Sequence, residues 1–218
     1  MCSEWRIISQ KGNGNLVERD GHRGFAKLSN PGREKLAHDL AMLVGVNVPF
    51  VEVCYIGKMG PFSVSHIHSA TLGSLREDAL TATPYSPDEQ TALRAASGLL
   101  PFLAWVGADD HYKDENLVVD DLDPAGLNIS AIDFDDAFSF ALETDCITAP
   151  VPPSLKIHFD KVRVGETLEK ILNLSEAEIM SCCAASADWL SHPQQVAEAL
   201  IARRKFLKQA MSDAGWLT

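Results

Sequence analysis

Short apolar runs bounded by turn-forming residues fill the first third of the chain and predict β-strands there. The expected strands cover residues 5–9, 24–28, 50–56 and 62–67. A turn rich in glycine and asparagine, at residues 11–15, lies between the first two strands. From Arg33 to Gly45 the pattern changes, because apolar residues recur three and four positions apart. The sequence therefore predicts a β-rich segment that contains one helix.

The rest of the chain has the periodicity of helices and is interrupted by one acidic segment. Ser86 and Glu89 form a capping box and predict a helix over residues 86–106. Ser175 and Glu178 form a second capping box. The helices expected after a proline-rich connector cover residues 165–174, 176–190 and 193–214.

These patterns predict an α+β fold with two unequal lobes. The smaller lobe, residues 1–69, is expected to be β-rich. The larger lobe, residues 70–218, is expected to be mostly helical and to contain an acidic hairpin. A chain of 218 residues is long enough for two small lobes that share one core.

The net charge of -11 is concentrated in one segment of the chain. Residues 109–145 contain twelve acidic residues and one basic residue, Lys113, so the remainder of the chain is balanced. The negative electrostatic field of this segment repels nucleic acid and attracts cations, including metal-bound nucleotides and basic protein segments. We therefore expect no direct nucleic-acid partner.

The N-terminal segment and the cysteines indicate where the protein resides. Residues 1–10 lack a basic region followed by an apolar core, so no secretory signal is expected. No run approaches the roughly 18 apolar residues that a membrane-spanning helix needs. The five cysteines are odd in number and lack CxxC spacing. Reduced thiols and a cytoplasmic location are therefore expected.

Oxygen-bearing side chains in the acidic segment have the spacing that metal-dependent phosphoryl transfer requires. Asp109 and Asp110 follow an apolar helix, and either carboxylate is a candidate for accepting a hydroxyl proton. Asn116 precedes one apolar run, and Asp133 ends the next. Amide and carboxylate oxygens suit Mg²⁺, which takes few protein ligands and completes its shell with water and phosphate oxygens. We therefore predict a catalytic loop at Asp109 or Asp110 and a Mg²⁺ site at Asn116 and Asp133.

A lysine and a glutamate in the β-rich segment extend this hypothesis. Lys27 ends an apolar run, and Glu34 lies seven residues later in the first turn of the expected helix. In bilobal kinases such a lysine neutralises nucleotide phosphates and a helix glutamate orients it. Gly12 and Gly14 lie between two expected strands, where backbone amides can cover phosphates. The third glycine of GxGxxG is absent there, so a plain hairpin turn is the alternative interpretation.

Other metal-binding and nucleophile patterns do not fit. A calcium loop that started at Asp109 would have Asp114 where glycine is needed. His66 and His68 have no neighbouring His or Cys, so we interpret them as ordinary strand histidines. No G-x-S-x-G elbow is present. The basic residues late in the last helix are expected to form a solvated face that complements the helix dipole: Arg203, Arg204, Lys205 and Lys208.

These residues together give a resemblance to the HipA-like and phosphatidylinositol 3- and 4-kinase-like branch of the protein kinase-like superfamily. That branch carries a loop of the type G-N-x-D-R-H-x-x-N after an apolar helix, followed by an I-D aspartate. The similar residues here are Trp105-Val-Gly-Ala-Asp-Asp-His111, then Asn116, then Ile132-Asp133. The segment from Arg33 to Pro49 also resembles that branch's helix αC and the strand after it.

The resemblance implies a bilobal kinase that uses ATP and Mg²⁺ and phosphorylates a hydroxyl, on a protein serine or threonine. The roles it implies are phosphate contact by Lys27, ion pairing by Glu34, proton acceptance by Asp109, support of the loop by His111, and metal binding by Asn116 and Asp133. A protein substrate or an antitoxin-type partner is implied by the likeness alone.

The chain departs from this pattern in three places. Two extra residues precede Asn116, Asp110 replaces the usual arginine, and Asp135 stands where glycine is usual after Phe134. These departures leave open a catalytically inactive pseudokinase that acts as a binding module. The run Ile-Asp-Phe-Asp-Asp-Ala also resembles the metal-binding end of aminoglycoside phosphotransferases and choline kinases. A small-molecule phosphotransferase is therefore the second alternative, and the sequence does not identify the acceptor.

Overall fold

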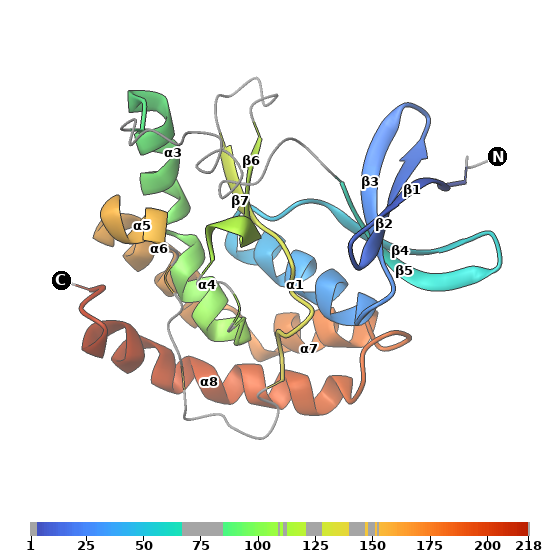
Figure 1. Ribbon diagram of the computed structural model, residues 1–218. Coiled ribbons are helices and arrows are strands. Elements are labelled where there is room, and N and C mark those ends of the chain that lie inside the picture. Colours follow the sequence, from blue (N-terminus) through green and yellow to red (C-terminus); the bar gives the residue numbers. More distant parts are fainter. Residues whose placement is uncertain are drawn as a thin grey trace.

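A β-sheet body and a larger helical body lie side by side in the structure, which is a computed structural model (Figure 1). It describes residues 4–66, 85–108, 110, 113–120, 128–139, 147, 151 and 153–217. The expected boundary between residues 69 and 70 lies outside these described residues. The predicted α+β class, with a β-rich beginning and a helical remainder, is confirmed.

Five antiparallel strands form the first sheet, in the order β1-β2-β3-β5-β4. They are β1 (Arg6–Lys11), β2 (Gly14–Arg19), β3 (His22–Lys27), β4 (Val51–Ile56) and β5 (Met59–His66). The sequence prediction of one turn over residues 11–15 is wrong, because it leaves out β2. Only Gly12 and Asn13 form the first turn, and Asp20 and Gly21, both at positive φ, form the second. Two such tight turns leave room for a complete strand between them.

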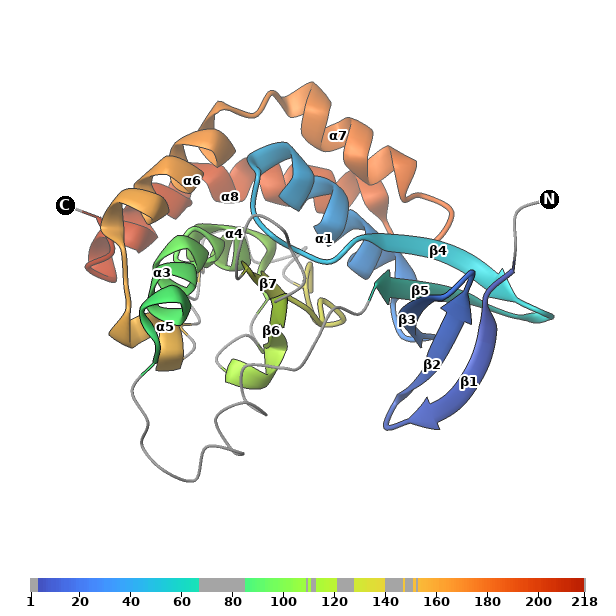
Figure 2. The same ribbon diagram turned by 90° about the horizontal axis from the view of Figure 1, so that it is seen from above.

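Helix α1 (Pro31–Val44) lies between the sheet and the helical body (Figures 1 and 2). It begins with proline at its first position and ends at Gly45, whose φ of 68° is the left-handed value common after a helix. Leu36 and Leu40, both fully buried, belong to the large hydrophobic core that also contains the later helices. The sheet has a separate, smaller core. Helix α1 therefore belongs to the core of the helical body and also packs against strands β4 and β5 of the sheet.

Among the described residues, six helices belong to that body. They are α3 (Pro87–Ala96), α4 (Leu99–Val106), α5 (Pro153–Ile157), α6 (Lys161–Asn173), α7 (Glu176–Ala185) and α8 (Pro193–Asp213). Every residue of α4 is buried, and α4 packs against α6 and α8 (Figure 2). None of the helices among the described residues is long and apolar enough to cross a membrane. Helix α4 is therefore the centre of the helical body.

The single helix expected over residues 86–106 is broken at Ser97 and Gly98, so that prediction is wrong. The hydroxyl of Ser97 accepts a hydrogen bond of 3.0 Å from the backbone N–H of Asp160. A Cβ at Gly98 would lie 2.8 Å from Thr167 Oγ1, so α6 approaches the chain closely at the break. The break also places Pro101 in the first turn of α4, where its missing N–H has no intrahelical partner to lose.

The predicted helix starts at the two capping boxes are confirmed, whereas one later start and one later end are wrong. Both capping boxes, Ser86 with Glu89 and Ser175 with Glu178, are present. Helix α6 begins earlier than expected, because the side chain of Asp160 caps its first turn. Helix α7 ends at Ala185 rather than residue 190. The observed bounds differ from the predicted ones where a polar cap or tertiary packing, rather than the spacing of apolar residues, determines where a helix begins or ends.

A second, two-stranded sheet is the predicted acidic hairpin. Its strands are β6 (Leu117–Asp120) and β7 (Asn128–Ala131), which pair antiparallel with Leu117 opposite Ala131. A single turn of 3-10 helix, Asp114–Asn116, leads into β6. The hairpin therefore carries Asn116 before its first strand and Asp133 after its second.

The structure tests the predictions for the basic residues of the last helix and for the histidines of the last expected strand. Arg203 is only 1% exposed, so the prediction of a solvated face is wrong for this residue, whereas Lys205 and Lys208 are exposed. His66 packs edge-on against two aromatic rings, as an ordinary strand histidine does. His68 lies outside the described residues.

Candidate active site

Lys27, the last residue of β3, joins the sheet to α1 and to the segment after β7. Its side chain is nearly buried, and its ammonium lies 2.6 Å from Asp133 Oδ1 and 3.5 Å from Glu34 Oε1. A second aspartate, Asp135, places Oδ2 at 3.9 Å from the same ammonium. The structure thus brings together the three predicted residues Lys27, Glu34 and Asp133, and it adds Asp135.

Glu34 lies on the buried side of α1 and is 3% exposed. Burial raises its pKa to about 7, against the opposing effect of Lys27. Its carboxylate also accepts a hydrogen bond from the backbone N–H of Phe134. Burial by itself lowers the pKa of Lys27, but attraction to Glu34, Asp133 and Asp135 outweighs it, and the pKa is raised. Lys27 therefore carries its charge at neutral pH.

The backbone of Asp133 turns the chain sharply out of β7. Its φ is 68°, a left-handed value that aspartate tolerates better than most side chains. The next side chain, Phe134, is buried and meets the ring of Phe102 on α4 edge-on, with the centroids 6.1 Å apart. This turn places Phe134 in the core and directs the Asp133 carboxylate to Lys27.

The connection between β3 and α1 holds Asp135 in place. Ser29 Oγ donates to Asp135 Oδ2 at 2.5 Å. Asn30 Nδ2 and Arg33 Nη1 donate to the backbone oxygen of Asp135 at 3.1 and 2.9 Å. The remaining carboxylate oxygen, Oδ1, is buried and has no hydrogen-bond partner among the described residues. An oxygen in this situation is costly unless a cation or a donor satisfies it.

The acids around Lys27 have the composition of a divalent-cation site. One carboxylate oxygen from each of Glu34, Asp133 and Asp135 lies within 4.8 Å of the others. The negative charge of the three carboxylates exceeds what the single ammonium of Lys27 neutralises. Hard oxygen donors with excess negative charge suit Mg²⁺, and the unpartnered Asp135 oxygen fits this interpretation.

The loop after α4 brings Asn116 beside the segment that contains Asp133. Asn116 is 8% exposed, and its backbone oxygen accepts a hydrogen bond of 2.9 Å from the N–H of Ile132. Its Nδ2 donates to the backbone oxygen of Asp110 at 3.0 Å, so Oδ1 is the side-chain atom that can face a cation. The predicted residues Asp109 and His111 lie outside the described residues. Of the two candidate bases, the structure therefore places Asp110.

The predicted glycines lie at and beside the turn between β1 and β2. Gly12 is in the turn, with a φ of 58° that favours glycine. Gly14 begins β2 and is buried, and a Cβ there would lie 2.6 Å from the ring of Phe25. Phe25 stands on β3 two residues before Lys27, so its ring and the lysine share one face of the sheet. Packing against Phe25 is therefore a sufficient reason for glycine at position 14.

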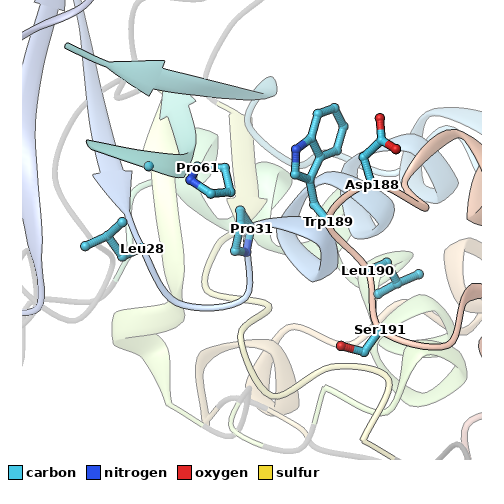
Figure 3. Close-up of a pocket in the computed structure, with 8 residues that line it drawn as sticks. Leu28, Pro31, Pro61, Asp188, Trp189, Leu190 and Ser191 are labelled. Atoms are coloured by element: carbon cyan, nitrogen blue, oxygen red, sulfur yellow. The ribbon is translucent and has the colours of Figure 1, made fainter. Parts of the chain in front are cut away.

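A hollow of about 400 Å³ opens beside this cluster but does not include it (Figure 3). It lies between the start of β5 and the segment before α8, and its lining includes Leu28, Pro31, Pro61 and Trp189. Asp188 is the charged residue of its lining. The described residues that line this hollow include a carboxylate and no lysine or arginine that could pair with phosphate. We therefore assign the chemistry to the Lys27 cluster.

Sequence reasoning missed two residues that the structure adds to the site. In the sequence Asp135 is only a departure from a Phe-Gly pattern, although it lies two residues after Asp133. In the sequence Lys113 is only the single basic residue of the acidic segment. In the structure its ammonium lies 2.6 Å from Asp110 Oδ1. A single basic residue among twelve acidic ones, three residues after a candidate catalytic aspartate, indicates that Lys113 belongs to the site.

Comparison with known proteins shows the fold. No family model and no curated protein match the chain. Among solved structures it is similar to the Helicobacter pylori proinflammatory kinase CtkA, with a TM-score of 0.58 and 12% sequence identity. The match covers 96% of this chain and 92% of that chain. The chain therefore has a bilobal, protein kinase-like fold, in which the sheet and α1 precede a helical C-terminal part.

Proposed function

We propose that this chain is an ATP- and Mg²⁺-dependent kinase of the HipA-like branch, with a protein serine or threonine hydroxyl as acceptor. One observation carries the proposal: the Lys27 ammonium lies between Glu34 and Asp133, which come from α1 and from the hairpin. A lysine that bridges these elements is the arrangement that phosphoryl transfer in bilobal kinases requires. The proposal keeps the division into a small lobe, residues 1–69, and a larger lobe, residues 70–218.

In this proposal the sheet and α1 bind the nucleotide phosphates. The Lys27 ammonium neutralises phosphate oxygens, and Glu34 holds it in position from α1. The turn at Gly12 and the start of β2 at Gly14 offer backbone N–H groups toward the phosphates. Phosphate charge would replace part of the attraction that Asp133 now exerts on Lys27.

The residues that would hold Mg²⁺ are Asn116, Asp133 and Asp135. All three offer oxygen atoms, and the buried, unpartnered Oδ1 of Asp135 supports their fit to a cation. When bound, the ion neutralises the negative charge that the phosphates bring and develop during transfer. Asp135 joins the set because Ser29, Asn30 and Arg33 keep it near Lys27.

The transfer itself needs one proton acceptor. The acceptor hydroxyl oxygen forms a bond to the γ-phosphorus while the bond from that phosphorus to the β–γ bridging oxygen breaks, and ADP leaves. The hydroxyl proton passes to the carboxylate of Asp109 or Asp110. Lys113, ion-paired with Asp110, would hold that carboxylate near the transferred group. His111 would support the same loop.

The acidic character of this face favours a basic partner. Glu115 is exposed in the 3-10 turn before β6, and residues 109–145 contain twelve acidic residues. A negative rim of this kind attracts a positively charged acceptor segment and repels nucleic acid. We therefore propose a basic protein segment, on a substrate or an antitoxin-type partner, as what this face binds.

The test compares two aspartates that lie three residues apart. Intact mass is measured after incubation with ATP and Mg²⁺, alone and with a panel of basic serine peptides, for the wild type, Asp133→Asn and Asp136→Asn. Nucleotide affinity is measured by calorimetry with and without Mg²⁺. Asp136 is exposed and provides the matched control.

The proposal predicts phosphate gain in the wild type and in Asp136→Asn, and its loss in Asp133→Asn. Asp109→Asn and Asp110→Asn then identify the base, because one of the two abolishes transfer. Metal-dependent nucleotide binding without transfer to any acceptor would favour the pseudokinase alternative. Transfer only to soluble alcohols would favour the small-molecule alternative. Absence of nucleotide binding would overturn the proposal.

A further inference from the structure

Arg203 is the largest charged side chain in the core of the helical body. It stands on α8, is 1% exposed, and lies among the largest fully buried side chains of the described residues. A buried guanidinium is costly unless several acceptors surround it. Its neighbours on the same helix, Lys205 and Lys208, are exposed, so general surface charge does not explain its position.

The guanidinium binds the end of α4, the helix that precedes the candidate catalytic loop. Arg203 Nε donates to the backbone oxygen of Trp105 at 3.0 Å, and Nη2 donates to that of Ala104 at 2.8 Å. In return, Trp105 Nε1 donates to the backbone oxygen of Leu200 at 3.0 Å. The last carbonyls of a helix have no intrahelical donors and carry partial negative charge. Arg203 therefore caps α4 with a fork of two hydrogen bonds.

The candidate catalytic loop and the segment after Asp133 are both attached to this capped end of α4. After Val106 the chain turns at Gly107, which has a left-handed φ of 66°, and it reaches Asp110 three residues later. The backbone oxygen of Val106 accepts a hydrogen bond of 2.9 Å from the N–H of Phe138, in the segment that follows Asp133. The carbonyls of three consecutive residues, 104–106, thus fix α8, the catalytic loop and the cation-binding segment to one another.

We propose that Arg203 is a positioning residue for phosphoryl transfer, which acts by holding the end of α4 so that the loop carboxylate and Asn116 keep their places. This inference rests on the proposed function. It assigns a role to a residue that contacts neither phosphate nor metal. A displacement of about 1 Å in a reacting group lowers the rate of chemistry by about 100-fold. The phosphate contacts of Lys27 and Glu34 come from the sheet and α1, so such a displacement should change nucleotide binding less than it changes the rate of transfer.

The test separates positioning from general stability. Arg203→Met removes the fork and keeps the apolar stem, Arg203→Lys keeps the charge with a single donor group, and Leu207→Ala removes a fully buried side chain one turn later on α8. Steady-state kinetics with ATP are measured for all three below their melting temperatures. Deuterium uptake is followed in peptides that cover residues 104–118 and, for comparison, α6.

We expect kcat to fall about 100-fold in Arg203→Met and about 10-fold in Arg203→Lys, with KM for ATP changed less than about threefold. Leu207→Ala, although less stable, should keep kcat within about threefold. Deuterium uptake should rise at residues 104–118 in the Arg203 variants, and α6 should be unchanged.

Unchanged kcat in either folded Arg203 variant would overturn the proposal, as would an equal fall in Leu207→Ala. The lysine variant decides the question if the methionine variant does not fold. If the wild type neither binds nucleotide nor transfers phosphate, the proposed function fails. The deuterium-uptake measurement does not depend on catalysis. Unchanged uptake at residues 104–118 would show that Arg203 does not hold the end of α4.

Discussion

Lys27 Nζ lies 2.6 Å from Asp133 Oδ1, closer than the 3.5 Å that separates it from Glu34 Oε1. The lysine of the sheet thus lies closer to the segment after β7 than to the helix that follows it in sequence. Because α1 shares the core of the helical body, both contacts cross from the sheet to that body. The Lys27 cluster is therefore a main polar connection between the two parts of the molecule.

Replacing Lys27 by Met should weaken nucleotide binding and destabilise the fold. Glu34 would remain buried without its cation, so the free energy of unfolding should fall by about 3 kcal/mol at pH 8. The loss should be smaller near pH 5.5, where Glu34 can take up a proton. Denaturant unfolding at both pH values checks this, with Lys35→Met as control. Lys35 pairs with Asp39 on the surface of α1, so its loss should cost only about 0.5 kcal/mol. Equal losses at the two sites would contradict the prediction.

Glu34 should make stability depend on pH between about 4.5 and 7. Its pKa of about 7 in the folded protein lies above the ordinary value of 4.5, so the folded chain binds the proton more tightly than the unfolded chain. The stabilisation is complete below pH 4.5 and is lost as pH rises through 7. Relative to Glu34→Gln, the wild-type unfolding free energy should decline over this range, by at most about 3 kcal/mol. Urea unfolding from pH 4.5 to pH 8 measures the difference, and two parallel profiles would contradict it.

Two glycines in helices should respond to alanine in opposite directions. A Cβ at Gly32, near the start of α1, would lie 2.4 Å from the backbone oxygen of Trp189, so Gly32→Ala should destabilise by about 1–3 kcal/mol. Gly165 in α6 has nothing within 4 Å of the same position. Gly165→Ala should therefore stabilise by about 0.5–1 kcal/mol through helix propensity. Thermal unfolding of both variants tests the close approach of α1 to the chain before α8, and a stabilised Gly32→Ala would argue against it.

The capping box of α7 provides a local test. Ser175 Oγ accepts a hydrogen bond from the N–H of Glu178, so Ser175→Ala should cost about 1 kcal/mol. Ser181 is exposed in the middle of the same helix, where alanine is the better helix former. Ser181→Ala should therefore be neutral or slightly stabilising. Denaturant unfolding distinguishes the two, and equal effects would show that the cap contributes little.

The sequence by itself determined features that depend on residues close together in the chain. Both capping boxes, the end of α1 at Gly45 and the hairpin with Asn116 before it and Asp133 after it follow from local pattern, and the structure contains them. The start of α1 lies at Pro31 rather than at the predicted Arg33. The pairing of Lys27 with Glu34 is also predicted, on the pattern of bilobal kinases, and the structure contains it. Short-range geometry allows few alternatives in each case.

Only the tertiary structure decided where distant segments meet. The break of the expected long helix at Ser97 depends on the chain at Asp160, and the capping role of Arg203 depends on α4, almost a hundred residues earlier. Asp135 joins the site because the β3–α1 connection holds it there. Burial and hydrogen bonding of a charged side chain depend on which remote backbone groups surround it, and periodicity along the chain carries no information about those groups.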